Sequence, residues 1–152
     1  MDRPLVVTDS SDRAPELIRE AGELAAAAGA PLRVLTVVSD DEFENDAAVI
    51  DSIEDVEGGS YNKTAPEYAE SVANSAVSDL LSDLDIETEA IGRAVADEDE
   101  RADAILSVAE DEACDYIFLI GQRRRPTGKA VFGDTAQRVI LNSDQYVVTL
   151  TE

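Results

Sequence analysis

The stretch that decides the fold reads Asp115-Tyr-Ile-Phe-Leu-Ile-Gly121-Gln-Arg-Arg-Arg-Pro-Thr-Gly128-Lys-Ala-Val-Phe-Gly133-Asp-Thr135. Its first part is a short apolar run, which is typical of a strand buried on both faces. A basic loop with glycines follows, and then a helix begins near its end. Backbone N–H groups at a helix N-terminus point toward an anion, and the helix dipole favours negative charge there. This order of strand, loop and helix predicts a site suited to phosphate.

The same alternation of strand-like and helix-like segments extends over the rest of the chain. Strands are predicted at residues 5–8, 32–38, 86–91, 116–120 and 146–150. Helices are predicted at about 12–28, around the apolar stripes of 72–81 and 105–113, and from about 134. A length of 152 residues suits one domain with its own core. Repeated strand–helix units therefore predict a single-domain α/β fold, a doubly wound parallel sheet with helices on both faces.

The composition excludes several classes of function. The chain carries 34 acidic and 12 basic residues, for a net charge of −22, which argues against nucleic-acid binding. Such a surface repels itself in dilute salt, so we expect a protein of a high-salt cytoplasm. No apolar run approaches the roughly 20 residues that span a bilayer, and no secretory segment is apparent. With one Cys and no His, an intrachain disulfide and His-based catalytic or metal sites are excluded.

Two connections have open interpretations. Residues 39–64 carry nine acidic residues between Asp40 and Glu57 and contain Gly58-Gly59, so we expect a flexible acidic loop, in which the apolar residues around 47–53 indicate a short helix. The spacing of a calcium-binding loop is absent from it. The second connection follows Gly92-Arg93, which the pattern places at the end of the third strand. It either reaches over the ligand site or only joins two elements.

Three segments give the chain a family resemblance. They are Val6-Val-Thr-Asp9-Ser-Ser11, Val34-Leu-Thr-Val-Val38 and the loop from Gly121 to Thr135. With these, the chain resembles the universal stress protein family over nearly its whole length. The resemblance implies a five-stranded parallel sheet of order 3-2-1-4-5, of the adenine nucleotide alpha hydrolase-like type, in a protein that is usually dimeric.

The resemblance also implies binding residues for an adenine nucleotide. Asp9 and Val38, with Val37 as the neighbouring choice, would hold the adenosine part. Gly121 and Gly133 match the first and last glycines of the family loop Gly-x2-Gly-x9-Gly-[Ser/Thr], which would hold ribose and phosphates. The remaining candidates are Arg123, Arg124, Asp134 and Thr135.

The loop departs from the family pattern at two positions. Arg124 stands where the second glycine is expected, and the loop is one residue shorter. Asp134 replaces the phosphate-contacting Ser or Thr, although the hydroxyl of Thr135 is adjacent. Asp134 is either a helix N-cap with Gln137 completing a capping box, or a residue of the phosphate site.

Each charged residue near the predicted site has either a role toward the ligand or a structural role. Arg123, Arg124, Arg125 and Lys129 either neutralise phosphates or pair with the acidic surface. Asp9 either accepts hydrogen bonds from a ligand or caps the turn formed with Ser10 and Ser11.

Three functions follow as hypotheses. The first is a universal stress protein that binds an adenine nucleotide, ATP first, with or without Mg²⁺, and acts in stress response or regulation. It would form a homodimer through the strand Tyr146 to Leu150 and act on unknown protein partners. The second is a dimeric interaction or scaffold protein of the same family without nucleotide. The third is an adenylating enzyme of another α/β class. No general base or metal dyad is apparent, so any ATPase activity would be slow.

Overall fold

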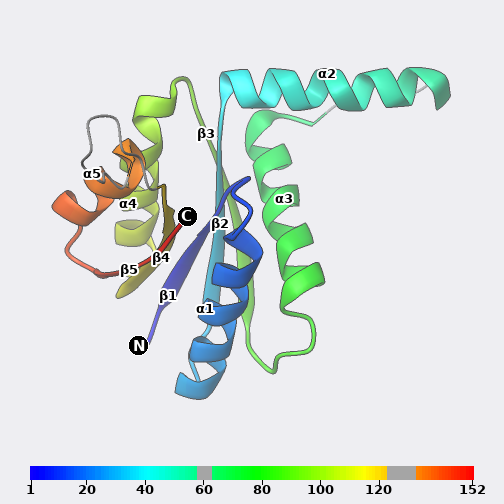
Figure 1. The fold of residues 1–152 in the computed structure, drawn as a ribbon. Coiled ribbons are helices and arrows are strands. Elements are labelled where there is room, and N and C mark those ends of the chain that lie inside the picture. The colour runs from blue at the N-terminus through cyan, green and yellow to red at the C-terminus, as the bar shows by residue number, and fades with distance from the viewer. Residues whose placement is uncertain (58–62, 123–132) are drawn as a thin grey trace.

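Five parallel strands form one sheet in the order β3-β2-β1-β4-β5 (Figure 1). The computed structural model describes residues 1–57, 63–122 and 133–152, with side chains except those of residues 50–57. The strands are β1 (Pro4–Thr8), β2 (Leu32–Ser39), β3 (Thr88–Val95), β4 (Tyr116–Gly121) and β5 (Tyr146–Thr151). The predicted fold class and strand order are confirmed.

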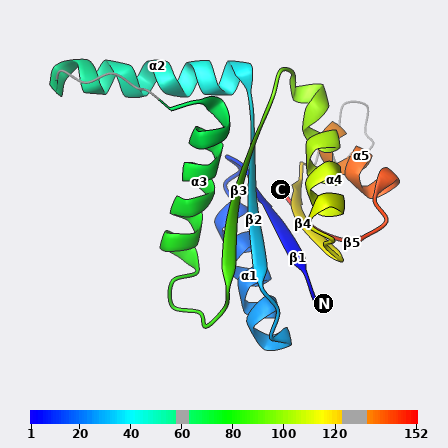
Figure 2. The same ribbon diagram turned by 180° about the vertical axis from the view of Figure 1, so that it is seen from behind.

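Helices cover both faces of this sheet, as the two opposite views show (Figure 1, Figure 2). One face carries α1 (Ala14–Ala28) and α3 (Ala65–Leu80), and the other carries α4 (Arg101–Asp111) and α5 (Asp134–Asn142). A further helix, α2 (Asp40–Glu57), extends past α3 away from the sheet, and a 3-10 turn, η1 (Glu98–Glu100), precedes α4. None of the described helices combines the length and the apolar character needed to cross a bilayer.

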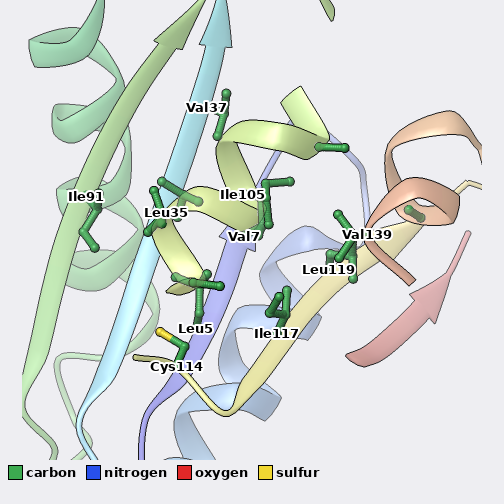
Figure 3. Packing of buried hydrophobic residues seen from close by; sticks show 14 residues of the cluster. Leu5, Val7, Leu35, Val37, Ile91, Ile105, Cys114, Ile117, Leu119 and Val139 are labelled. Atoms are coloured by element: carbon green, nitrogen blue, oxygen red, sulfur yellow. The ribbon is translucent and has the colours of Figure 1, made fainter. Parts of the chain in front are cut away.

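Two cores follow from the alternation of side chains along the strands. Leu5, Val7, Leu35 and Ile117 point to the face under α4 and α5 (Figure 3). Val6, Val34 and Phe118, which lie between them in sequence, pack on the opposite face against α1 and α3. Cys114 belongs to the first core, where burial raises the pKa of its thiol, as expected of a small buried side chain.

Helix ends explain where several elements start and stop. Gly29 ends α1 in the left-handed conformation with φ 67°, which glycine adopts without a Cβ penalty. Pro15 lies in the first turn, but α1 begins at Ala14, two residues later than predicted. Thr64 caps α3 in a reciprocal capping box with Glu67.

The expected acidic loop is wrong over residues 40–57, which form the helix α2, and the short helix indicated around 47–53 lies within it. Its start is a capping box that the sequence contains: the Ser39 N–H donates to Glu42 Oε1 at 3.0 Å, and the Glu42 N–H donates to Ser39 Oγ at 3.3 Å. Three acidic residues occupy the first turn, where the helix dipole stabilises negative charge. High charge density is thus compatible with a helix here.

The third strand lies further along the chain than its alternation predicted. It pairs with β2 in register from Leu32↔Thr88 to Ser39↔Val95. Gly92 is therefore inside the strand, not at its end. A Cβ at this position would meet the backbone nitrogen of Glu70 and the backbone oxygen of Pro66. Glycine at this position lets α3 approach the strand backbone closely.

Candidate functional site

A cavity of about 180 Å³ lies beyond the carboxyl ends of the strands. In the observed strand order, the chain turns to one side of β1 first and to the other side later, so β1 and β4 flank the point where ligands bind in open α/β sheets. The polar lining of the cavity comes from the segment after β1, from α2, η1 and α4, and from the residues at the end of β4 and the start of α5. These polar residues are Asp9, Ser10, Ser11, Glu42, Glu98, Arg101, Gln122, Asp134 and Thr135.

Asp9 lies in this lining, one position after the end of β1. One oxygen of its carboxylate, Oδ1, accepts the N–H of Ser11 at 2.9 Å, so the side chain also stabilises the turn that leads into α1. The two interpretations of Asp9 are therefore compatible, because a carboxylate oxygen accepts more than one hydrogen bond. Its role toward a ligand stays a prediction.

Val38 does not line the cavity. It is buried within β2, on the opposite face of the sheet from Val37, whose side chain packs in the core under α4 (Figure 3). The carbonyl of Val37, the neighbouring choice, is connected to the site because it accepts a hydrogen bond from the cavity residue Arg101. Neither Val38 nor Val37 is among the residues that line the cavity, and the role of either toward a ligand stays a prediction.

The predicted phosphate loop is described only at its two ends. Gly121 is the buried last residue of β4, and its carbonyl accepts the N–H of Glu152 at 3.0 Å. Gly133 lies in the cavity lining with φ 85°, a conformation that favours glycine. Arg123 and Arg124, with Arg125 and Lys129, lie outside the described residues.

The proposed N-cap role of Asp134 is wrong. Gly133 occupies the N-cap position of α5, and Asp134 is the first helical residue, without a side-chain capping bond. Asp134 and Thr135 both line the cavity. Their backbone N–H groups belong to the first turn of α5, where a helix presents unpaired donors to an anion.

The residues that sequence reasoning missed are Arg101, Glu42 and Glu98. Arg101 is 8% exposed and lies at the start of α4. Its Nε donates to Glu98 Oε1 at 2.8 Å, its Nη1 donates to the carbonyl of Val37, and its Nη2 donates to Glu42. Glu98 comes from the connection after β3, so this connection contributes to the cavity lining. The Ser39–Glu42 capping box was the available signal in the sequence.

This cluster is held together by charge. Burial alone would lower the pKa of Arg101, but the hydrogen bond to Glu98 and the negative charges of Glu42 and Glu98 raise it above its ordinary value. The described lining as a whole contains one guanidinium and four carboxylates, with Asp9 and Asp134 as the other two. Within the described ranges, no group of three or more potential ligands is placed to hold a metal ion.

Solved structures with the same fold come from universal stress proteins. A universal stress protein from Archaeoglobus fulgidus is 25% identical, with a TM-score of 0.63 and 98% of each chain covered. A universal stress protein from the same organism in complex with dAMP is 23% identical, with a TM-score of 0.58 and coverage of 98% and 97%. A universal stress protein in complex with cAMP is 18% identical, with a TM-score of 0.60 and coverage of 99% and 96%.

Sequence comparison gives the family directly. No curated protein matches the chain. The model of the universal stress protein family, in contrast, matches residues 1–150, which is nearly all of the 152 residues. The three segments that carry the resemblance lie in β1 and the turn after it, in β2, and between β4 and α5. The chain belongs to the universal stress protein family.

Proposed function

We propose that this protein binds an adenine nucleotide in the cavity at the carboxyl ends of β1, β2 and β4, with ATP as the first candidate ligand. The observation that carries the proposal is the convergence of Asp9, Gly133 and the first turn of α5 on one cavity at the switch point of the sheet. Structures of relatives in complex with dAMP and cAMP support the same ligand class.

The phosphates would lie toward α5. The helix N-terminus supplies backbone N–H donors, and the sequence directly after Gln122 supplies Arg123, Arg124, Arg125 and Lys129. These four positive charges would offset the excess of carboxylates in the described lining. Mg²⁺ would enter with the triphosphate, bound mainly by phosphate oxygens and water.

The test is equilibrium dialysis of labelled ATP in molar potassium chloride, with and without Mg²⁺. We expect saturable binding with one site per chain, and Asp9→Ala should weaken it by about tenfold or more, because a hydrogen bond to a charged group is lost. Asp9→Asn separates the two roles of the residue, since an amide oxygen still accepts the Ser11 N–H.

The matched control is Asp12→Ala, which removes the same charge three positions later and outside the cavity lining. It should bind ATP like the wild type. Equal losses in Asp9→Ala and Asp12→Ala would show that general charge, not the site, is being measured. No binding up to millimolar ATP by a folded wild type would refute the nucleotide proposal.

We further propose that the protein acts as a homodimer through β5, in stress response or regulation, in a cytoplasm of high salt. β5 forms one edge of the described sheet, and edge strands offer backbone groups for pairing with another chain. Tyr146 and Val148 on this strand are 70% and 38% exposed. Pairing of two edges across a two-fold axis would cover both side chains.

The second candidate is a dimeric interaction or scaffold protein that does not bind nucleotide. Asp134 favours it, because a carboxylate at the start of α5 repels phosphates where other members carry a hydroxyl. The dialysis experiment separates the two candidates directly.

A further inference from the structure

Arg101 belongs to the cavity wall and to the anchor of α2 at the same time. Its guanidinium contacts β2 through the Val37 carbonyl, α2 through Glu42, and η1 through both carboxylate oxygens of Glu98, at 2.8 and 2.9 Å. Arg101, Glu42 and Glu98 all line the cavity. A change in the position of this one side chain therefore affects three elements.

Glu42 has a second function at the start of α2. Its Oε1 accepts the backbone N–H of Ser39 in the capping box and also the Arg101 Nη2. The first turn of α2 is thus fixed by a carboxylate that a cavity residue holds in place. If the Arg101 contact is lost, the Glu42 carboxylate keeps its hydrogen bond from the Ser39 N–H in the capping box.

The rest of α2 has few described contacts with the body of the protein. Phe43 lies against the ring of Tyr68 with centroids 5.8 Å apart, and the Tyr68 hydroxyl donates to Asp46 at 2.7 Å. Further along, Val49 is 60% exposed, and Figure 1 shows α2 extending away from the sheet. The described contacts that hold this helix to the body thus lie in its first two turns, together with the Glu42–Arg101 pair.

The cavity is small for the proposed ligand. Sites for small molecules usually enclose roughly 300–1,000 Å³, whereas this cavity encloses about 180 Å³. Movement of a lining residue would enlarge this cavity for a nucleotide. Arg101 can move with limited cost, because Glu98 lies three residues before it and can keep its charge paired.

We propose that an adenine nucleotide displaces the Arg101 guanidinium from Val37 and Glu42, and that this displacement releases α2. The amino group of a nucleobase can donate to the Val37 carbonyl in place of Arg101, so this acceptor does not stay unsatisfied. Glu42 keeps its bond with Ser39 but loses its link to α4. This inference rests on the proposed nucleotide binding and adds an output, the movement of α2.

Hydrogen exchange of α2 tests the displacement. In the wild type, amides of residues 40–49 should exchange faster with saturating ATP than without it. In Arg101→Gln they should already exchange fast without ligand, and ATP should add little. Glu42→Gln, which leaves Arg101 in place, should also show fast exchange of residues 40–49 without ligand. It keeps the test valid if Arg101→Gln does not fold.

Affinity provides the second readout. Arg101→Gln should bind adenosine about tenfold more tightly, because the ligand no longer breaks the charged hydrogen bonds of Arg101. Glu42→Gln should bind it more tightly by a smaller factor, because the bond between Arg101 and the Val37 carbonyl remains. Adenosine is uncharged, so the altered charge does not by itself change its attraction. Arg19→Gln is the matched control: it removes a guanidinium that pairs with Glu23 and Asp83, outside the cavity lining, and should change neither readout.

The outcomes distinguish this inference from the proposed function. ATP binding without a change in α2 exchange, and without tighter adenosine binding in the variants, would overturn the inference and leave the nucleotide proposal standing. Binding by Arg101→Gln but not by the wild type would show that Arg101 blocks the cavity and is not displaced, and would overturn the inference. Absence of binding in the wild type and in both variants would refute both.

Discussion

At the scale of single residues, the start of α5 shows how the backbone conformation of one residue decides which residue is the N-cap. The sequence Gly133-Asp134-Thr135 predicted an Asp cap, because Asp is a preferred N-cap residue. Gly133 takes the cap position instead, with φ 85°, and Asp134 moves into the first turn. There its carboxylate interacts favourably with the helix dipole but lies in the cavity lining. Side-chain preference alone did not reveal which residue the helix would begin with.

Asp134→Ser should therefore raise the affinity for ATP by roughly threefold to tenfold and leave adenosine binding unchanged, because the carboxylate repels phosphates and salt screens part of this repulsion. Dialysis of both ligands measures the difference. Asp144→Ser removes an equal charge outside the lining and is the control. An equal gain for ATP and adenosine would mean that Asp134 acts through the shape of the site.

At the scale of elements, the sequence predicted strands and amphipathic helices well, and it failed where tertiary contacts set the limits. β3 is longer than its alternating stretch because all of its residues pair with β2. α2 was indicated only around residues 47–53, because apolar periodicity does not detect a helix that is exposed over most of its described length. The capping pair Ser39 and Glu42 was the better indicator of that helix.

Gly92→Ala tests the closest contact between two elements. We expect a loss of about 3 kcal/mol or more in the free energy of unfolding, since overpacking usually costs 1–3 kcal/mol and here the neighbours are the backbone atoms of α3. Urea unfolding in constant potassium chloride measures it.

Gly29→Ala provides the comparison for this variant. At that position no atom lies near the added Cβ, and only the left-handed backbone conformation opposes the change, at a cost of about 1–2 kcal/mol. A Gly92→Ala variant as stable as the wild type would show that α3 moves away from β3 easily.

At the scale of the whole molecule, topology was predictable because it needs only the order of strands and helices and the recognised segments. The site was predictable in part. Asp9, Gly133, Asp134 and Thr135 meet at one cavity, since they follow strands or begin a helix at the same end of the sheet. Arg101 and Glu98 were missed because their proximity to Glu42 depends on how three separate connections fold over that end.

The charge of the whole molecule should control dimer formation. Two chains of net charge −22 repel each other, so the proposed dimer should be favoured by molar potassium chloride and weakened in dilute salt. Val148→Asp should give a monomer, because it places a charge on the β5 edge. Sedimentation velocity in a salt series measures both effects.

The control for the dimer is Leu24→Asp on α1, since Leu24 is 40% exposed and Val148 38%. It should remain dimeric. A wild type that is monomeric at every salt concentration would contradict the dimer, and a dimer that survives Val148→Asp would place the interface on another surface.

The position of β1 in the centre of the sheet has a consequence for biosynthesis. The main chain at Arg3 bonds with Asp115, 112 residues later, and β1 pairs with β4 from Pro4↔Tyr116 onward. At 5–20 residues per second, a ribosome needs roughly 6 to 22 s between these two segments. During translation the edge of β1 that pairs with β4 therefore stays unpaired for this time. The emerging polypeptide has to be kept from aggregating until β4 leaves the exit tunnel.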